Sequence, residues 1–422
     1  MIEEFGSRSY FTAADYVVCG LMLAASLAIG VYYGLRGGGQ RTSKAYILAD
    51  RSMGVVPVTL SLLASFFSGI GLQGVPADVY YHGPGMILSV IPFWCGGALT
   101  FLFFLPLYYR LGMASAYEYL ELRFNHAVKI CGVVSYLFFT IFYSGLVTFM
   151  GCVAANAVTG IGLSTAIVIL SIVCSIYTVI GGIKAVLWTD SLQMILMLCT
   201  TLAIIIKCIK EVGLGPLWSI ATDGKRTSLA IFTTDMSEFY NGWTFILSTF
   251  FVGIVFTNQY MVQRLVVCKS HATARRSLLG YMIGTSIFLF ILMFVGISLY
   301  AYYEGCDPTT MGYTTKNDQI LPYFTVDVFS GSPGLPGLLL TGLFGAALST
   351  SSSILNAIAT LVGEHFVKAY WKGLSDTKYT IILKCIVVAA SAVSLGIAFL
   401  VPTIGDAVPV SSFPFGFGFS SK

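Results

Sequence analysis

The stretch from Gly54 to Tyr81 reads GVVPVTLSLLASFFSGIGLQGVPADVYY, and the interpretation of the whole chain starts from it. No charged residue occurs between Gly54 and Ala77, and this length is enough to cross about 30 Å of hydrocarbon. The run SGIGLQGVP, which begins at Ser68, contains three glycines and a proline, and these residues weaken helix continuity. The stretch therefore predicts a membrane-spanning helix that is broken after Phe67.

A break at bilayer depth has consequences for the backbone. Freed N–H and C=O groups cannot face lipid, so a broken helix predicts an enclosed or water-filled cavity, in which free carbonyls are good ligands for a small cation. The same residues also fit a kinked helix whose glycines allow close packing. This stretch alone leaves both interpretations open.

The composition sets the class of protein. The 422 residues are 56% hydrophobic and 10% charged, whereas about a quarter of residues in soluble domains are charged. This composition predicts an all-α polytopic membrane protein. The first apolar segment, Tyr16 to Leu35, lacks the basic leader and small-residue cleavage site of a signal peptide, so it is expected to remain as a span. No basic block indicates a nucleic-acid partner.

A window of span length identifies ten candidate helices. They cover residues 14–35, 54–80, 85–109, 130–157, 161–181, 188–209, 241–263, 278–302, 335–363 and 379–401. Alternating the loops puts most Lys and Arg, Arg264 among them, on one side, which the positive-inside rule makes cytoplasmic. The N-terminus is then extracellular. Residues 114–124 predict a short interfacial helix on the inner side, and 211–240 and 303–333 are expected to be long outer loops.

The spans after the first one suggest a repeat. Five lie in residues 54–210 and four in 241–401, and because five is odd, a second copy would be inverted. We therefore expect an extracellular terminus, an extra helix and a basic loop in 1–53, two inverted repeats separated by the outer loop 211–240, and a non-spanning tail in 402–422. On this interpretation the last core helix is missing. The alternative is a native design with nine core helices.

A second stretch, Pro336 to Gly363, reads PGLLLTGLFGAALSTSSSILNAIATLVG. Ala346, Ser349, Thr350 and Ser353 fall on one helical face. Their hydroxyls and the Ala346 carbonyl supply half of a cation cage, and the broken helix supplies the other half. The alternative is a small-residue seam for helix packing.

The apolar stretches contain no cluster of His, Cys, Asp and Glu, no nucleophile beside a base and no phosphate loop. The sequence therefore argues against an enzyme or an ATP-driven pump. A passive channel is disfavoured because no charge ring or filter motif occurs. Hydroxyls, carbonyls and a rare carboxylate remain, and these groups suit a hard monovalent cation.

Several of these pieces together resemble the sodium/solute symporter family, and within it the monocarboxylate, multivitamin and iodide branch. The matching pieces, which extend over nearly the whole chain, are residues 60–83, the helix ASAYEYLELRF, residues 141–161, YTVIGGIKAVLWTDSLQMILM (177–197), NQYMVQRL (258–265) and residues 335–360. The resemblance implies two inverted five-helix repeats with an extra N-terminal helix, and solute and sodium bound at the midplane.

The resemblance also implies site residues. The shared sodium site would use the carbonyls of Ala64, Phe67 and Ala346 and the hydroxyls of Ser349 and Thr350, with Asp190 as countercharge. A second sodium or substrate cavity would involve Ser68, Tyr143, Gly69, Gly71, Gln73, Gln193 and Gln259. Simpler roles stay open: Asp190 as a helix cap, Tyr143 as a packed aromatic, and Gln193 and Gln259 as helix-contact amides. The iodide-transporting member of the branch carries glutamine where this chain has Gly71, which argues against an iodide site, and the alternative is that Gln73, two positions on, substitutes for it.

The functional expectation is a sodium-coupled symporter of the plasma membrane that moves a small organic anion by alternating access. Its partners would be the anion, the lipid bilayer and Na+, with no cofactor other than the coupling ion. The alternative is a truncated, non-transporting product that acts at most through a full-length partner. These two hypotheses share the same ion site.

Overall fold

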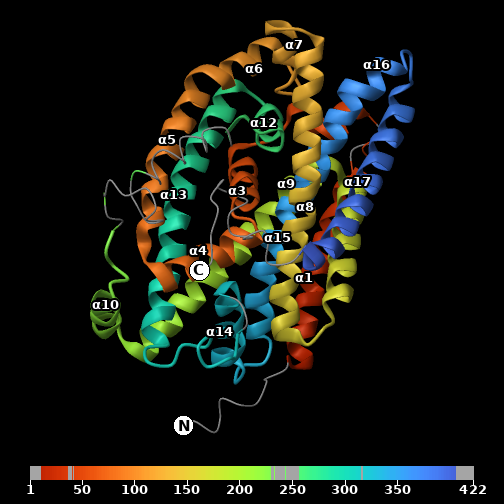
Figure 1. Cartoon of the computed structure of the whole chain (residues 1–422). Coiled ribbons are helices and arrows are strands. Elements are labelled where there is room, and N and C mark those ends of the chain that lie inside the picture. The colour runs from red at the N-terminus through yellow and green to blue at the C-terminus, as the bar shows by residue number, and fades with distance from the viewer. Residues whose placement is uncertain are drawn as a thin grey trace.

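The computed structural model describes residues 11–36, 40, 42–229, 232, 243, 256–314 and 317–404. Within these ranges all regular structure is helical apart from one isolated bridge between Met53 and Cys268. The longest helices are α1 (Ala13–Leu35), α8 (His126–Thr159), α9 (Leu163–Val212), α13 (His271–Tyr302), α15 (Leu335–Val362) and α17 (Asp376–Ile404). They form the bundle of Figure 1.

The spans agree with most of the ten that the sequence predicts. Among the described residues, seven helices are long and apolar enough to cross a membrane, and the bent pair α3 (Val55–Phe66) and α4 (Gly69–His82) makes an eighth. One of the seven, Pro84–Leu111, contains α5 (Val90–Leu99) and α6 (Leu105–Leu111). The predicted span 241–263 lies mostly outside the described residues. Its described end is α12 (Gln259–Val266), which continues past the predicted boundary.

The predicted break is confirmed. The axes of α3 and α4 differ by 61°, and Phe67, with φ −83° and ψ 72°, leaves helical geometry. The packing interpretation does not require glycine at Gly69, because an added Cβ would lie 3.7 Å from the Ala347 Cβ, an ordinary van der Waals contact. It does not hold for Gly74, because no atom lies within 4 Å of such a Cβ. The break is thus more than a consequence of close glycine packing.

A second interruption divides α9. Gly182 has φ 58° and ψ −161°, which lies outside the helical region, and an added Cβ there would lie 2.8 Å from the ring of Tyr46 in α2 (Ser43–Leu48). Two helical segments therefore meet at Gly182 where the sequence predicts the separate spans 161–181 and 188–209. Only glycine fits this backbone and this contact.

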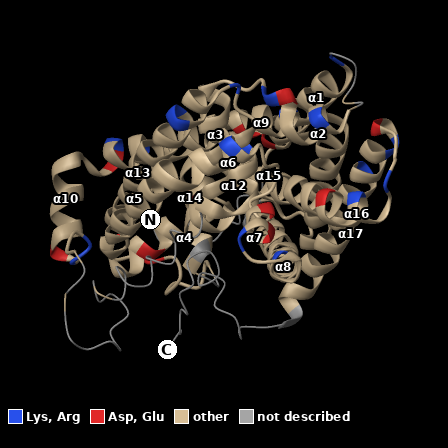
Figure 2. Ribbon diagram, turned by 90° about the horizontal axis from the view of Figure 1, so that it is seen from above, with Lys and Arg blue, Asp and Glu red and all other residues tan. Residues whose placement is uncertain are grey.

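The two ends of the bundle differ as expected. In Figure 1, α7 (Glu118–Arg123), α12 and α16 (Lys368–Tyr370) lie at one end, whereas α10 (Leu214–Asp223) and α14 (Ile320–Phe329) lie at the other. The expected outer loops thus contain two short helices. Figure 2 shows how sparse the charged residues are on the ribbon. Which end faces the cytoplasm stays a prediction, as do the boundaries of the two repeats.

α15 is the central helix. In its most apolar window 94% of the residues are buried, compared with 22% in α1. It packs against α1, α8, α9 and α17 and against both halves of the broken helix. Because it is enclosed on all sides, its hydroxyls must find partners inside the protein, whereas the buried amide of Asn356 has no hydrogen-bond partner among the described residues.

Candidate functional site

The hydroxyl face of α15 lies directly against the broken helix. The Ser349 hydroxyl donates a hydrogen bond to the carbonyl of Ala64 at 2.8 Å, and the Thr350 hydroxyl donates one to the carbonyl of Ser65 at 3.2 Å. These bonds join the last turn of α3 to the middle of α15. The structure therefore brings together the two stretches that the sequence assigns to one cation cage.

The Ala346 carbonyl completes this group of oxygens. It lies 3.1 Å from the Ser349 hydroxyl and 3.2 Å from the Thr350 hydroxyl, so each hydroxyl shares its one proton between this carbonyl and a carbonyl of α3. Ala64, Ala346, Ser349 and Thr350 are fully buried, and in the described part of the chain no donor hydrogen-bonds to the Phe67 carbonyl. Uncharged oxygens gathered at a helix break suit sodium, which prefers hard oxygen ligands.

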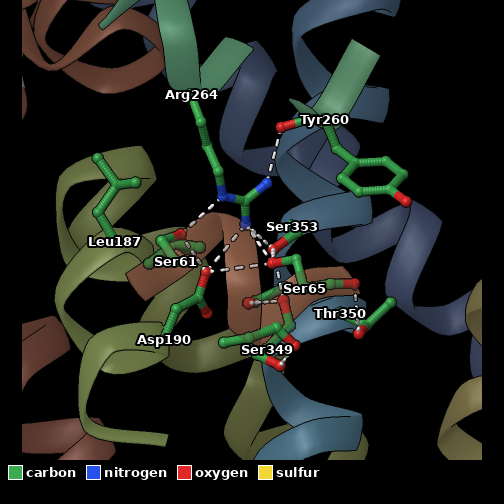
Figure 3. A network of polar contacts seen from close by, with 12 residues as sticks. Ser61, Ser65, Leu187, Asp190, Tyr260, Arg264, Ser349, Thr350 and Ser353 are labelled. Atoms are coloured by element: carbon green, nitrogen blue, oxygen red, sulfur yellow. Dashed lines mark hydrogen bonds and ion pairs between the residues drawn. The ribbon is translucent and has the colours of Figure 1, made fainter. Parts of the chain in front are cut away.

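A charged network lies next to these oxygens (Figure 3). The Arg264 guanidinium forms an ion pair with Asp190 at 2.9 Å and donates to Ser61 at 2.6 Å and to Ser65 at 2.7 Å. It also donates to Ser353. The network ties α3, α9, α12 and α15 together, and it meets the predicted sodium ligands at Ser65, whose carbonyl accepts from Thr350.

This network corrects two expectations. Asp190 does not cap a helix, because its Oδ2 atom accepts from the side chains of Ser61 and Arg264. Its negative charge is paired with the guanidinium of Arg264. Arg264 is not an inner-loop charge, because its side chain is 1% exposed. Its role was missed because it follows an apolar run, although it lies in the motif NQYMVQRL.

The second predicted group is only partly assembled. The Tyr143 hydroxyl lies 3.5 Å from the Ser68 hydroxyl, to which it donates. Gln73 instead folds back on its own helix and donates to the Gly69 carbonyl at 3.0 Å. Around Gly71 there is open space, with only the Phe67 ring 4.0 Å from an added Cβ.

The two other predicted glutamines lie in different places. Gln193 packs against Gly345 of α15, and its buried amide has no hydrogen-bond partner in the described ranges. Gln259 does not belong to this group. Its amide donates to the carbonyl of Ala114 at 3.0 Å and accepts from the N–H of Ala116 at 3.1 Å, so it fixes the segment before α7.

The profile of the sodium:solute symporter family matches residues 46–408. The chain belongs to the sodium:solute symporter family. In this family it is 36% identical to sodium-coupled monocarboxylate transporter 1 of Xenopus laevis over 97% of the chain and 67% of the relative.

Two other relatives show the same coverage pattern. The human sodium/iodide cotransporter is 35% identical over 97% of this chain and 64% of its own length. The rabbit sodium-dependent multivitamin transporter is 36% identical over 97% of this chain and 65% of its own length. The chain thus spans about two thirds of the length of these family members.

A solved structure confirms the fold class. A Na+-coupled sialic acid symporter in its substrate-bound outward-open state superposes with a TM-score of 0.86 at 25% identity, over 96% of this chain and 86% of that one. The all-α polytopic fold of the inverted-repeat type is therefore shown. A nucleobase-cation symporter, with a TM-score of 0.56 at 14% identity, shares the fold alone.

Proposed function

We propose that this member of the family is a plasma-membrane symporter that couples sodium entry to the uptake of a small organic anion, a monocarboxylate or a vitamin-like acid. The observation that carries the proposal is the contact of Ser349 and Thr350 with the last turn of α3. Sodium would be held there by the Ala64, Phe67 and Ala346 carbonyls and these two hydroxyls. The relatives named for monocarboxylates and vitamins support the solute class.

The break also provides a place for the anion. α4 begins at Gly69 beside Ser68 and Tyr143, and the partial positive charge of a helix N-terminus stabilises a carboxylate. Sodium bound a few residues away adds to this attraction. Each ligand then raises the affinity for the other by the same coupling free energy, about 1–3 kcal/mol.

Transport follows when the two repeats move relative to one another. Each sodium that moves inward down 100 mV contributes about 2.3 kcal/mol. If two sodium ions accompany one monovalent anion, transport carries net charge. We expect sodium and solute together to produce an inward current.

The test is uptake of radiolabelled lactate, nicotinate, biotin and pantothenate in oocytes that express the chain. At least one solute should accumulate in sodium medium and return to the level of water-injected oocytes when choline replaces sodium. Iodide serves as a comparison solute, and we expect no accumulation because Gly71 provides no side chain. Equal uptake of every solute in both media would contradict the symporter function.

The non-transporting alternative gives a different pair of results. It predicts no sodium-dependent uptake, combined with sodium binding by the purified chain. Measuring both properties on the same preparation distinguishes a chain that binds but does not transport from one that lacks the sodium site.

A further inference from the structure

A small cavity lined by both hydroxyls and leucines lies on the side of α15 that faces away from the broken helix. Its walls come from four helices, α8, α9, α15 and α17. Six hydroxyls line it: Ser144, Thr148, Ser171, Ser351, Ser391 and Ser394. Its open volume is about 10 Å³, which is enough for one water-sized particle. None of these residues belongs to the sodium site.

Some of the hydroxyls that line the cavity still have a donor or acceptor that forms no hydrogen bond. Ser394 donates to the Ser144 hydroxyl at 2.8 Å, and Thr148 donates to the Ser144 carbonyl at 2.9 Å. Ser351 can then donate to Thr148 at 3.1 Å. The proton of the Ser144 hydroxyl is left over, and Ser171 and Ser391 have no hydrogen-bond partner in the described part of the chain.

Three unused hydroxyls around one small space specify the ligand. A buried water makes about three hydrogen bonds, and unpaired hydroxyls inside a bilayer cost free energy. A sodium ion fits poorly because it needs several oxygens in direct contact at once, and Ser144, Thr148, Ser351 and Ser394 already hydrogen-bond one another. We propose that the cavity binds one ordered water molecule, which accepts from Ser144 and pairs with Ser171 and Ser391.

This water would lie next to residues of both predicted sites. Ser144 follows Tyr143 of the predicted second site, and Ser351 follows Thr350 of the predicted sodium site. The water therefore connects α8, α9 and α17, and the Thr148–Ser351 hydrogen bond links α8 to α15 beside it. This role is independent of whether the chain transports a solute.

Cys174 provides a probe for the water, since its side chain lines the same cavity and is 3% exposed. X-ray radiolysis makes hydroxyl radicals from water, and a radical made in the cavity oxidises the adjacent thiol. Cys152 is the internal control, because it is 0% exposed and is not part of the lining. In the purified full chain, mass spectrometry should show Cys174 oxidised several times faster than Cys152.

Two variants on α17 sharpen the test. Ser391→Val fills the cavity, so oxidation of Cys174 should fall to the rate of Cys152. Ala392→Val adds carbon to an exposed neighbouring position and should leave the Cys174 rate unchanged. Equal rates for the two cysteines in the wild-type chain would overturn the proposal. So would a folded Ser391→Val variant, shown by its size-exclusion profile, that keeps the wild-type Cys174 rate.

Discussion

Asp190 and Arg264 place two opposite charges inside an otherwise apolar bundle. Removing two charges from water is costly, and their attraction compensates only when hydrogen bonds satisfy the remaining atoms. Ser61, Ser65 and Ser353 supply such bonds, whereas the Oδ1 atom of Asp190 has no hydrogen-bond partner in the described part of the chain. We infer that the pair sets the relative positions of α3, α9, α12 and α15 around the sodium site.

Arg264→Ala should therefore be strongly destabilising, by about 3–5 kcal/mol, because it leaves a buried carboxylate without its partner. The double variant Asp190→Ala with Arg264→Ala should lose less free energy of unfolding than the two single variants lose together. The measurement is reversible unfolding in detergent. Lys368→Ala is the control, since its pair with Glu364 has a half-exposed lysine and contributes about 0–1 kcal/mol. Equal losses for Arg264→Ala and Lys368→Ala would contradict this role.

At the residue scale the sequence predicts what depends on local spacing. Ser349 and Thr350 follow Ala346 by three and four positions, so a helix must place them on one face. The pairing of Arg264 with Asp190 has no such local signal, because 74 residues separate them. Gln259 was misplaced for the same reason, since its partners lie in the segment before α7.

At the scale of elements, interruptions in the helices define the architecture. The break between α3 and α4 was predictable because glycines and a proline follow Phe67 in an uncharged span. The two segments of α9 were predictable from their lengths. The helices in the outer loops were not predicted, because α10 and α14 have only 10 residues each and lie below the length of a span. Packing against the bundle stabilises these short helices, and this packing cannot be seen in the local sequence.

Gly182→Ala tests the interruption of α9. Alanine at φ 58° is strained, and its Cβ would lie 2.8 Å from Tyr46. We therefore expect the free energy of unfolding to fall by more than about 1 kcal/mol. The apparent unfolding temperature of the purified variant measures this loss. Gly20→Ala on α1 is the matched control, because nothing lies within 4 Å of the added Cβ. A Gly182→Ala variant as stable as the Gly20→Ala variant would show that the bend does not need glycine.

For the whole molecule, the order of apolar segments predicted the class of fold, because a bilayer restricts buried backbone to helices. The inverted repeat followed from the odd number of spans in the first group. What the pattern could not give is the enclosure of α15, which depends on contacts with at least four other helices. Because α15 is enclosed, its row of hydroxyls faces other helices and can line a binding site.

The central claim is that sodium binds where the broken helix meets α15, and the most direct measurement is the unfolding temperature of the purified chain in sodium chloride and in choline chloride. Sodium at 100 times its dissociation constant should stabilise the chain by about 2.7 kcal/mol. Thr350→Ala should lose most of this increase. Thr341→Ala should keep it, because Thr341 donates to Leu338 in the same helix, away from the site. Identical unfolding temperatures in the two salts, or a full sodium effect in Thr350→Ala, would contradict the account.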